Sequence, residues 1–297
     1  MSEVSEVAVT GEAGRIAVRK TYKLYIGGAF PRSESGRSYA VSGHAGGFLA
    51  NAALASRKDA RDAVLAARKA FAGWSGATAY NRGQVLYRVA EVLEGRRAQF
   101  VAEVRLATGA SAAHAEAEVD EAIDRWVWYA GWADKIAQVR GAANPVAGPY
   151  FNFSVPEPTG VVAVLAPQDS PLLGLVACLA PAIVSGNTCV VVASERLPLP
   201  AVTLAEVLAT SDVPGGVVNI LTGRVAEIAP WLASHMDVNA IDVTGAPGAL
   251  ADDMAVAAAD NLKRVVRIPA SDWAAEPGIE RMVAYLETKT VWHPLGF

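Results

Sequence analysis

The second half of the chain contains short, continuous apolar runs that recur about every 25 residues, as expected for strands buried on both faces of a parallel sheet. Segments with helical periodicity separate these runs. The predicted strands are Val161–Leu165, Cys189–Val192, Val217–Leu221, Ala240–Val243 and Arg264–Ile268, and the helices between them cover residues 171–184, 198–209, 225–234 and 249–259. The repeated order of strand and helix predicts an α/β fold with a doubly wound, Rossmann-like parallel sheet.

The first residues of the chain show a different pattern. Residues 1–20 have no sustained periodicity, so we predict a flexible N-terminal arm there. Tyr22–Ile26 alternates between polar and apolar residues, Gly27–Gly28 is a turn signal, and a second strand is expected near Ser38–Val41. This stretch therefore predicts a β-hairpin.

A helical region is predicted between this hairpin and the sheet. Ser56 followed three residues later by Asp59 predicts a helix start with a capping box. Further helices are expected over residues 80–94, 96–107 and 112–136. The last of them carries an aromatic stripe, which we interpret as core packing and not as a ligand-binding surface: Trp126, Trp128, Tyr129 and Trp132.

Two further segments alternate like strands and lie far apart in the chain, at residues 150–158 and 286–292. The predicted organisation is a flexible arm (1–20), a hairpin of an oligomerisation subdomain (21–45), a helical part (46–140), an oligomerisation strand (141–158), a Rossmann-like core (159–270), and a linker with a C-terminal oligomerisation strand (271–297). An unpaired strand needs a partner edge, which either a neighbouring subunit or this chain's own fold can provide.

Composition narrows the classes of function. The chain has 297 residues, is 52% hydrophobic and carries a net charge of −4, so a nucleic-acid partner is not expected. The start of the chain lacks a secretion signal and no apolar stretch is long enough to span a bilayer, so we expect a cytoplasmic protein without a membrane partner. Two cysteines and four scattered histidines show no metal-ligand spacing, so no metal site is proposed.

Several ordered motifs carry a family resemblance. They are Gly160–Pro167, Ser185–Thr188 with Ser194 and Glu195, Val217–Gly223, His235–Val238 with Val243–Gly245, Asn261–Val265, and the tail Leu286–Pro294. Together they resemble the aldehyde dehydrogenase superfamily. The tail follows Asn261–Pro269 after only about twenty residues, so the resemblance implies a member whose catalytic domain is missing. In this respect the chain is similar to the second, non-catalytic module of tandem aldehyde dehydrogenases.

The resemblance also implies that the family's chemistry is degenerate here. The oxyanion-hole asparagine aligns with Asp169, which cannot donate a hydrogen bond when ionised. The general-base glutamate aligns with Ile268, which cannot accept a proton. No cysteine follows Cys189, so the nucleophile has no counterpart, and we expect no catalytic residue in this chain.

Cofactor contacts are reduced in the same way. The resemblance leaves Glu195 as a ribose contact and Thr244 and Gly245 as the nicotinamide-side turn, whereas Val192 replaces the expected lysine. We favour a simpler interpretation, in which Glu195 is a solvated loop carboxylate and Thr244–Gly245 is a strand-end turn. We therefore expect no cofactor, with NAD or NADP as the alternative.

The leading hypothesis is a non-catalytic structural or regulatory subunit that assembles by strand addition, either with a complete aldehyde dehydrogenase or with itself. The resemblance implies that Phe151, Phe153, Leu286, Thr288, Thr290 and Trp292 lie on the oligomerisation strands. The alternatives are an NAD(P)-dependent aldehyde dehydrogenase, which oxidises an aldehyde to a carboxylic acid, and a non-catalytic NAD(P) sensor.

Overall fold

The largest sheet lies in the second half of the chain, as the apolar runs predict. The computed structural model describes residues 20–268 and 272–296, so the predicted N-terminal arm lies almost wholly outside the described residues. Five parallel strands pair in the order β7-β6-β5-β8-β9. Their bounds are β5 Val161–Leu165, β6 Thr188–Val192, β7 Val218–Leu221, β8 Ala240–Asp242 and β9 Arg264–Val266. The predicted α/β fold is confirmed.

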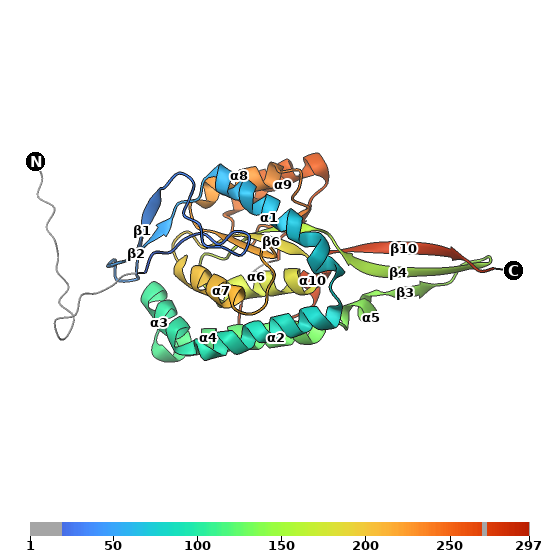
Figure 1. Ribbon diagram of the computed structural model, residues 1–297, viewed down its shortest axis with the longest axis horizontal. Helices are drawn as coiled ribbons and strands as arrows, with labels where there is room; N and C mark the ends of the chain where they lie inside the picture. Colours follow the sequence, from blue (N-terminus) through green and yellow to red (C-terminus); the bar gives the residue numbers. More distant parts are fainter. Residues whose placement is uncertain (1–19, 269–271, 297) are drawn as a thin grey trace, which may run out of the picture.

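Helices cover both faces of this sheet (Figure 1). The connecting helices are α6 Leu173–Val184, α7 Leu199–Ala209, α8 Val225–Ser234 and α9 Gly248–Ala258. Alternate residues of β5 enter two different cores, with Val162 and Val164 on the side of α6, and Val161 and Ala163 on the side of α8. Because both faces are buried, every residue of β5 is apolar.

In the helical region predicted before the sheet, residues 57–76 form a helix that packs on the sheet itself, whereas the helices over residues 79–95 and 112–132 pack on α6. The capping box of α1 (Arg57–Gly76) is present, since the Ser56 hydroxyl accepts from the Asp59 N–H and the Asp59 carboxylate accepts from the Ser56 N–H. Trp126 is fully buried and Tyr129 nearly so, and Trp128 and Trp132 are partly buried against the same core, so the aromatic stripe packs on the core as predicted. The helices are α1 Arg57–Gly76, α2 Ala79–Gly95, α3 Arg97–Thr108, α4 Ala112–Trp132 and α5 Ile136–Arg140. None of the helices within the described ranges is both long and apolar enough to cross a membrane.

The hairpin near the N-terminus differs from the prediction. Strand β1 (Ser38–Ser42) pairs with β2 (Phe48–Ala53), and not with Tyr22–Ile26. The glycine turn forms, because Ile26 and Ala29 exchange backbone hydrogen bonds around Gly27 and Gly28, both of which have positive φ. The residues before that turn pair elsewhere, since Tyr25 exchanges backbone hydrogen bonds with Ile220 of β7. The expected pairing was wrong because the open edge of the large sheet takes this segment.

The two alternating segments form an arm that projects from the body (Figure 1). Strand β4 (Tyr150–Pro158) pairs antiparallel with β10 (Leu286–Pro294) along all nine residues, and the short β3 (Ala142–Asn144) pairs with the other edge of β4. The short helix α10 (Glu280–Ala284) leads into β10, and a 3₁₀ turn over Ala259–Asn261 precedes β9. The two predicted oligomerisation strands, β4 and β10, therefore pair with each other within this chain.

Candidate functional site

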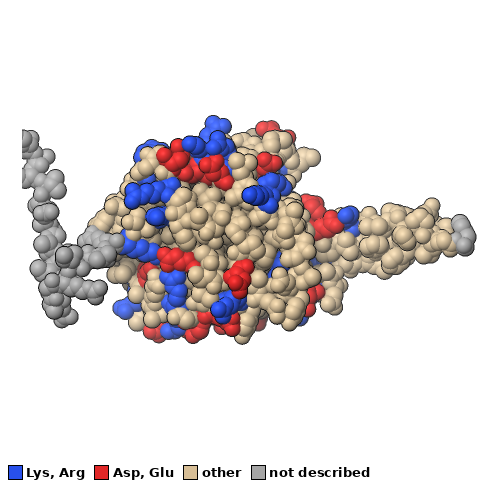
Figure 2. Space-filling model, viewed as in Figure 1, with Lys and Arg blue, Asp and Glu red and all other residues tan. Residues whose placement is uncertain are grey.

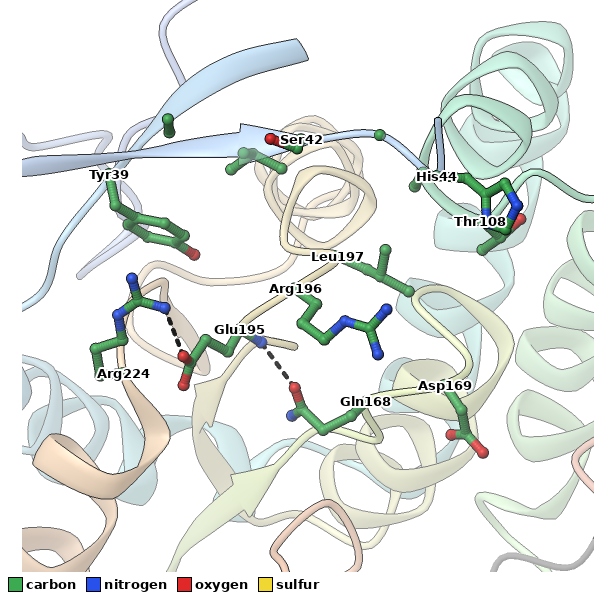
Figure 3. Close-up of a pocket in the computed structure, with 14 residues that line it drawn as sticks. Tyr39, Ser42, His44, Thr108, Gln168, Asp169, Glu195, Arg196, Leu197 and Arg224 are labelled. Carbon is green, nitrogen blue, oxygen red and sulfur yellow. Dashed lines mark hydrogen bonds and ion pairs between the residues drawn. The ribbon is translucent and has the colours of Figure 1, made fainter. Parts of the chain in front are cut away.

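A cavity of about 490 Å³ opens at the carboxyl ends of β5 and β6, beneath the β1–β2 hairpin (Figure 3). In open parallel sheets this end of the strands is where ligands bind. The cavity brings together Asp169 and Glu195, both predicted from the sequence, with residues that were not. The polar side chains that line it are Tyr39, Ser42, His44, Thr108, Gln168, Asp169, Glu195, Arg196 and Arg224.

Gln168 fixes the two loops that form the floor of this cavity. Its side-chain Nε2 donates to the Ala166 carbonyl over 2.9 Å, and its Oε1 accepts from the Glu195 N–H over 2.9 Å. The Ser194 hydroxyl donates to the same Oε1 over 3.3 Å. The loop after β5 is thereby tied to the loop after β6, so the cavity floor is held in place by side-chain hydrogen bonds.

The residue next to it, Asp169, is exposed at the edge of the cavity. The donors that follow it are already used, because the Leu172 N–H and the Ser170 hydroxyl both donate to Oε1 of Glu118 over 3.2 Å. The Glu118 carboxylate at the start of α6 also balances the positive end of the dipole of that helix. At the position that the sequence resemblance aligns with an oxyanion-hole donor, the loop therefore presents a carboxylate.

Glu195 lies on the other side of the cavity and is paired. Its Oε1 is 2.5 Å from Nη1 of Arg224, and its Oε2 accepts from the Val225 N–H at the start of α8 over 3.2 Å. This hydrogen bond to Glu195 raises the pKa of the Arg224 guanidinium. The α8 N-terminus is therefore occupied by a carboxylate from this chain, which a dinucleotide phosphate would have to displace.

Thr244 and Gly245, which were predicted as cofactor contacts, make hydrogen bonds to other residues of the fold. The Thr244 N–H donates to Oδ1 of Asp242 over 2.9 Å, and its hydroxyl accepts from Nη2 of Arg281 over 3.2 Å. The Gly245 N–H donates to the Leu165 carbonyl over 3.1 Å, and a Cβ at this glycine would lie 2.0 Å from the Ala166 carbonyl oxygen. Val192 is fully buried in β6. The cofactor role of Thr244 and Gly245 stays a prediction, and their observed contacts are structural.

Asp242 is the centre of a buried polar cluster. Both Nη1 of Arg281 and the Tyr285 hydroxyl donate to its Oδ2, the latter over 2.6 Å. Asp242 and Tyr285 have no exposed surface and Arg281 has 7%. Burial, followed by the nearby Asp242 carboxylate, raises the pKa of Tyr285 well above its usual range. The segment before β10 is thus joined to β8 by a buried ion pair.

Ile268, which the sequence resemblance aligns with a general base, lines a different cavity from Asp169. This second cavity has a volume of about 190 Å³ and is also lined by Trp273 and Arg281. Arg125 closes one side of this cavity, because its Nη2 donates to the Trp273 carbonyl over 2.7 Å and to the Ala275 carbonyl over 3.0 Å. A hydrocarbon side chain in this position offers neither a base nor an anchor for water.

Both cysteines lie inside the fold. Cys178 and Cys189 are fully buried, and burial, followed by the Asp242 carboxylate, raises the pKa of each thiol. A nucleophilic cysteine needs a lowered pKa and access, so neither thiol meets the requirement. Within residues 20–268 and 272–296, no cluster of three histidine, cysteine or acidic side chains is arranged to hold a metal ion.

Several charged residues of these sites were not singled out from the sequence, among them Asp242, Arg281 and Arg224. The signal for Asp242 was present, because a carboxylate inside an apolar strand requires a buried cation or several donors. Arg224 lies in a loop and carries no comparable signal in the sequence. Its pairing with Glu195 joins two loops 29 residues apart, which local patterns do not reveal.

Comparison with known proteins gives a consistent result. The aldehyde dehydrogenase family model matches residues 31–267. Retinal dehydrogenase 2 from Gallus gallus is 36% identical over 253 residues, covering 83% of this chain and 48% of that protein. The cytosolic 10-formyltetrahydrofolate dehydrogenase of Mus musculus is 32% identical over 259 residues, covering 84% of this chain and 28% of that protein. The chain thus spans about half, or less, of the length of these relatives.

Solved structures agree with these matches. HpcC from Thermus thermophilus superposes with a TM-score of 0.80 at 30% identity, over 84% of this chain and 48% of that protein. PnpE in complex with nicotinamide adenine dinucleotide superposes with a TM-score of 0.77 at 31% identity, over 82% and 50%. With a family match over most of its length and the same fold, this chain belongs to the aldehyde dehydrogenase family.

Proposed function

We propose that this chain is a non-catalytic member of the family that acts as a structural or regulatory subunit and assembles with a complete aldehyde dehydrogenase by strand addition. The observation that carries the proposal is the projecting arm of β3, β4 and β10. The arm lies outside the body of the protein and has exposed aromatic side chains on its strands (Figure 1).

The apolar surface of the arm is concentrated away from its base. Phe151 and Phe153 stack with ring centroids 5.3 Å apart, and Tyr150 meets Trp292 edge to face at 5.8 Å. Trp292 is 59% exposed and Phe151 is 50% exposed. In Figure 2 this part of the arm shows no charged side chains, in contrast to the body. An apolar surface of this kind is typical of an interaction site.

The backbone of the arm offers a second means of binding. In the strand order β10-β4-β3, strand β10 lies at an edge, and the described residues place no strand beyond it. Thr288 and Thr290 are exposed on this strand, whereas Leu286 is buried at its base. An edge of nine residues can take an added strand, with the main chain supplying affinity and the aromatic side chains supplying specificity.

The chemistry of the sites supports a subunit without activity of its own. Asp169 offers a carboxylate in place of an oxyanion donor, Ile268 offers no base, and both thiols are buried. Loss of the nucleophile or base in an enzyme whose groups act together typically lowers kcat about a million-fold. We expect no reduced nucleotide to form above background when the purified chain is mixed with aldehydes and NAD or NADP. Turnover above background would support the dehydrogenase alternative.

The assembly is tested by native mass spectrometry of the tagged chain isolated from its own cells, with bound proteins identified. We expect a complex that contains a complete aldehyde dehydrogenase, and we expect Trp292→Glu to dissociate it. Leu106→Glu, at an equally exposed apolar residue on α3, is the matched control and should leave the complex intact. Copies of this chain alone, or a monomer, would overturn the proposed partner.

A nicotinamide nucleotide sensor is the second candidate. It is favoured by Glu195, which lies on the loop after β6 and lines the open cavity, and by the NAD bound to the similar PnpE structure. Calorimetry with NAD and NADP tests it, since binding by wild type that is lost in Glu195→Ala supports the sensor. No heat with either nucleotide would exclude it.

A further inference from the structure

Arg125 of α4 is a buried cation without a carboxylate partner. The residue is only 6% exposed, and its Nη2 donates to the carbonyls of Trp273 and Ala275, which are neutral acceptors. Within residues 20–268 and 272–296 no acidic side chain forms an ion pair with it, and the gap between these ranges contains no acidic residue. A charge that is buried without a counter-ion is costly, so this guanidinium indicates a missing anion.

Arg125 lines a cavity with room for a small ligand. The cavity has a volume of about 190 Å³ and is also lined by Trp273 and Arg281. Pockets for cofactors and drug-sized ligands typically exceed about 300 Å³, so this one fits a small ion and not a dinucleotide. Most of its lining residues follow residue 267, where the match to the family model ends. The cavity is therefore built largely from a segment that the family model does not cover.

Trp273 supplies a second unused donor. Its indole Nε1 is shielded from solvent and has no hydrogen-bond partner in the part of the chain that the structure describes. A buried donor without a partner is rare in native proteins and indicates that a ligand or water completes it. The residue is held from two sides, because its carbonyl accepts from Arg125 and the Arg281 guanidinium lies 5.8 Å from the centre of its ring. Both donors therefore have fixed positions before a ligand binds.

The charges around the cavity favour one negative charge and not two. The Arg281 guanidinium is already paired with Asp242, so it does not need a second anion. Three exposed carboxylates line the cavity, none of which is ion-paired with Arg125 within the described ranges: Asp272, Glu276 and Glu280. Water screens these exposed groups, but they repel a dianion more strongly than a monoanion.

We propose that this cavity binds a small monoanion, with the Arg125 guanidinium and the Trp273 indole N–H as its donors. A guanidinium binds an anion through charge-assisted hydrogen bonds, which are stronger than those between neutral groups. Two sources share the same chemistry: a short carboxylate such as acetate, and an inorganic ion such as chloride. The bound anion joins α4 to the segment that leads into α10, so it should stabilise the folded chain. The site goes beyond the assembly function and does not use the exposed surface of the arm.

Urea unfolding of the full chain at neutral pH, with sodium acetate, sodium chloride or sodium sulfate added, tests the proposal. A ligand that binds only the folded state raises the free energy of unfolding with the logarithm of its concentration above Kd. We expect a monoanion to raise the unfolding midpoint of wild type more than that of Arg125→Gln in the same solution, because general salt effects act on both proteins alike. The monoanion that gives the larger extra shift identifies the source.

Arg125→Gln should weaken binding of the anion by at least about tenfold, because a charged hydrogen bond is lost. Trp273→Phe should weaken it by about fivefold, the loss typical of one hydrogen bond. Trp231→Phe is the matched control, since Trp231 is also a partly buried tryptophan but lies on α8 outside this cavity. This control should keep the full dependence on the anion. The two tryptophan variants repeat the test if Arg125→Gln is too unstable to measure.

The proposal is overturned if neither monoanion shifts wild type more than Arg125→Gln, because the exposed carboxylates would then already compensate the guanidinium. It also fails if sulfate gives an equal extra shift, or if Trp273→Phe and Trp231→Phe respond alike. Each variant is compared with itself without added anion, so a general loss of stability does not hide the result. Native mass spectrometry of Arg125→Gln should still show the assembled complex, so failure of this site is distinguishable from failure of the arm.

Discussion

Two carboxylate–guanidinium pairs lie near the carboxyl ends of strands in the same sheet, and they differ mainly in what covers them. Asp242, the last residue of β8, pairs with Arg281, and 0% and 9% of their side chains are exposed. Glu195 and Arg224 pair beyond β6 with 31% and 47% exposed. The segment that leads into β10 seals the first pair, whereas the hairpin leaves a cavity over the second. The carboxylate and guanidinium at Asp242 and Arg281 therefore form a buried structural contact, whereas the same groups at Glu195 and Arg224 are accessible to a ligand.

The two pairs are expected to behave differently because water reaches one of them and not the other. Water screens an exposed ion pair, so such a pair contributes little to stability and its groups remain free to exchange partners. A buried pair cannot exchange partners with water, and removal of one member leaves an uncompensated charge in the interior. The sequence-predicted residue Glu195 belongs to the exchangeable kind, which is why the nucleotide-sensor alternative places its ligand at β6 and not at β8.

The largest expected effect comes from breaking the sealed pair. Arg281→Met leaves the Asp242 carboxylate buried without its cation, which typically costs about 3 to 5 kcal/mol. The free energy of unfolding from urea titration measures this loss. Arg224→Met, the equivalent change at the open pair, should cost about 1 kcal/mol or less.

The double variant Asp242→Leu/Arg281→Met sharpens this comparison. With both charges removed it should be more stable than Arg281→Met alone, because no charge is left unpaired in the interior. Equal losses for Arg281→Met and Arg224→Met would contradict the distinction between the two pairs.

A second, smaller effect is expected at the turn after β8. Gly245→Ala would bring a Cβ to 2.0 Å from the Ala166 carbonyl oxygen, so the loops after β5 and β8 must separate. Overpacking of this kind typically costs about 1 to 3 kcal/mol, again read from urea unfolding. Gly248→Ala is the control, because a Cβ there meets nothing within 4 Å and the residue begins α9. If both variants have the same free energy of unfolding, the close contact at Gly245 does not limit the size of the residue there.

Much of this architecture could be predicted from local patterns. The run at Val161–Leu165 is apolar because both faces of a parallel sheet are buried, and Ser56 with Asp59 marks a helix start by direct side-chain contacts. Signals of this kind depend only on neighbours in the sequence. They determined the order of strands and helices, but not all of the pairing, as the segment at Tyr25 shows.

The candidate sites were harder to predict. Glu195 and Asp169 were found from motifs, but Arg224 and Arg281 reach their partners across 29 and 39 residues. Such pairings depend on how loops and the C-terminal segment fold over the sheet, and a single sequence carries no periodic signal for them. The cavity around Glu195 exists only because the hairpin forms between Ser38 and Ala53, where the sequence pattern had placed a different pairing.

The smallest effect extends the comparison to a third pair, which joins the body to the arm. Arg264 of β9 binds Glu287 of β10 through two hydrogen bonds of 2.6 Å, with 38% and 51% of the side chains exposed. The hydrogen bond from Arg264 lowers the pKa of Glu287 below its usual 4.5, and Thr159 adds to the shift. A depressed pKa means that the pair stabilises the fold above pH 4.5 and that this stability is lost as the pH falls through the folded-state pKa.

We therefore expect Glu287→Gln to lower the free energy of unfolding by about 0.5 kcal/mol or less at pH 7, because solvent screens the pair. The difference from wild type should shrink as the pH falls below 4.5, where protonation removes the same charge. Urea unfolding of both proteins from pH 7 down to pH 3 measures this convergence. A difference that stays constant with pH would show that the amide disturbs packing at the base of the arm. A loss as large as that of Arg281→Met would show that exposure does not rank the three pairs, because the most exposed pair would then match the sealed one.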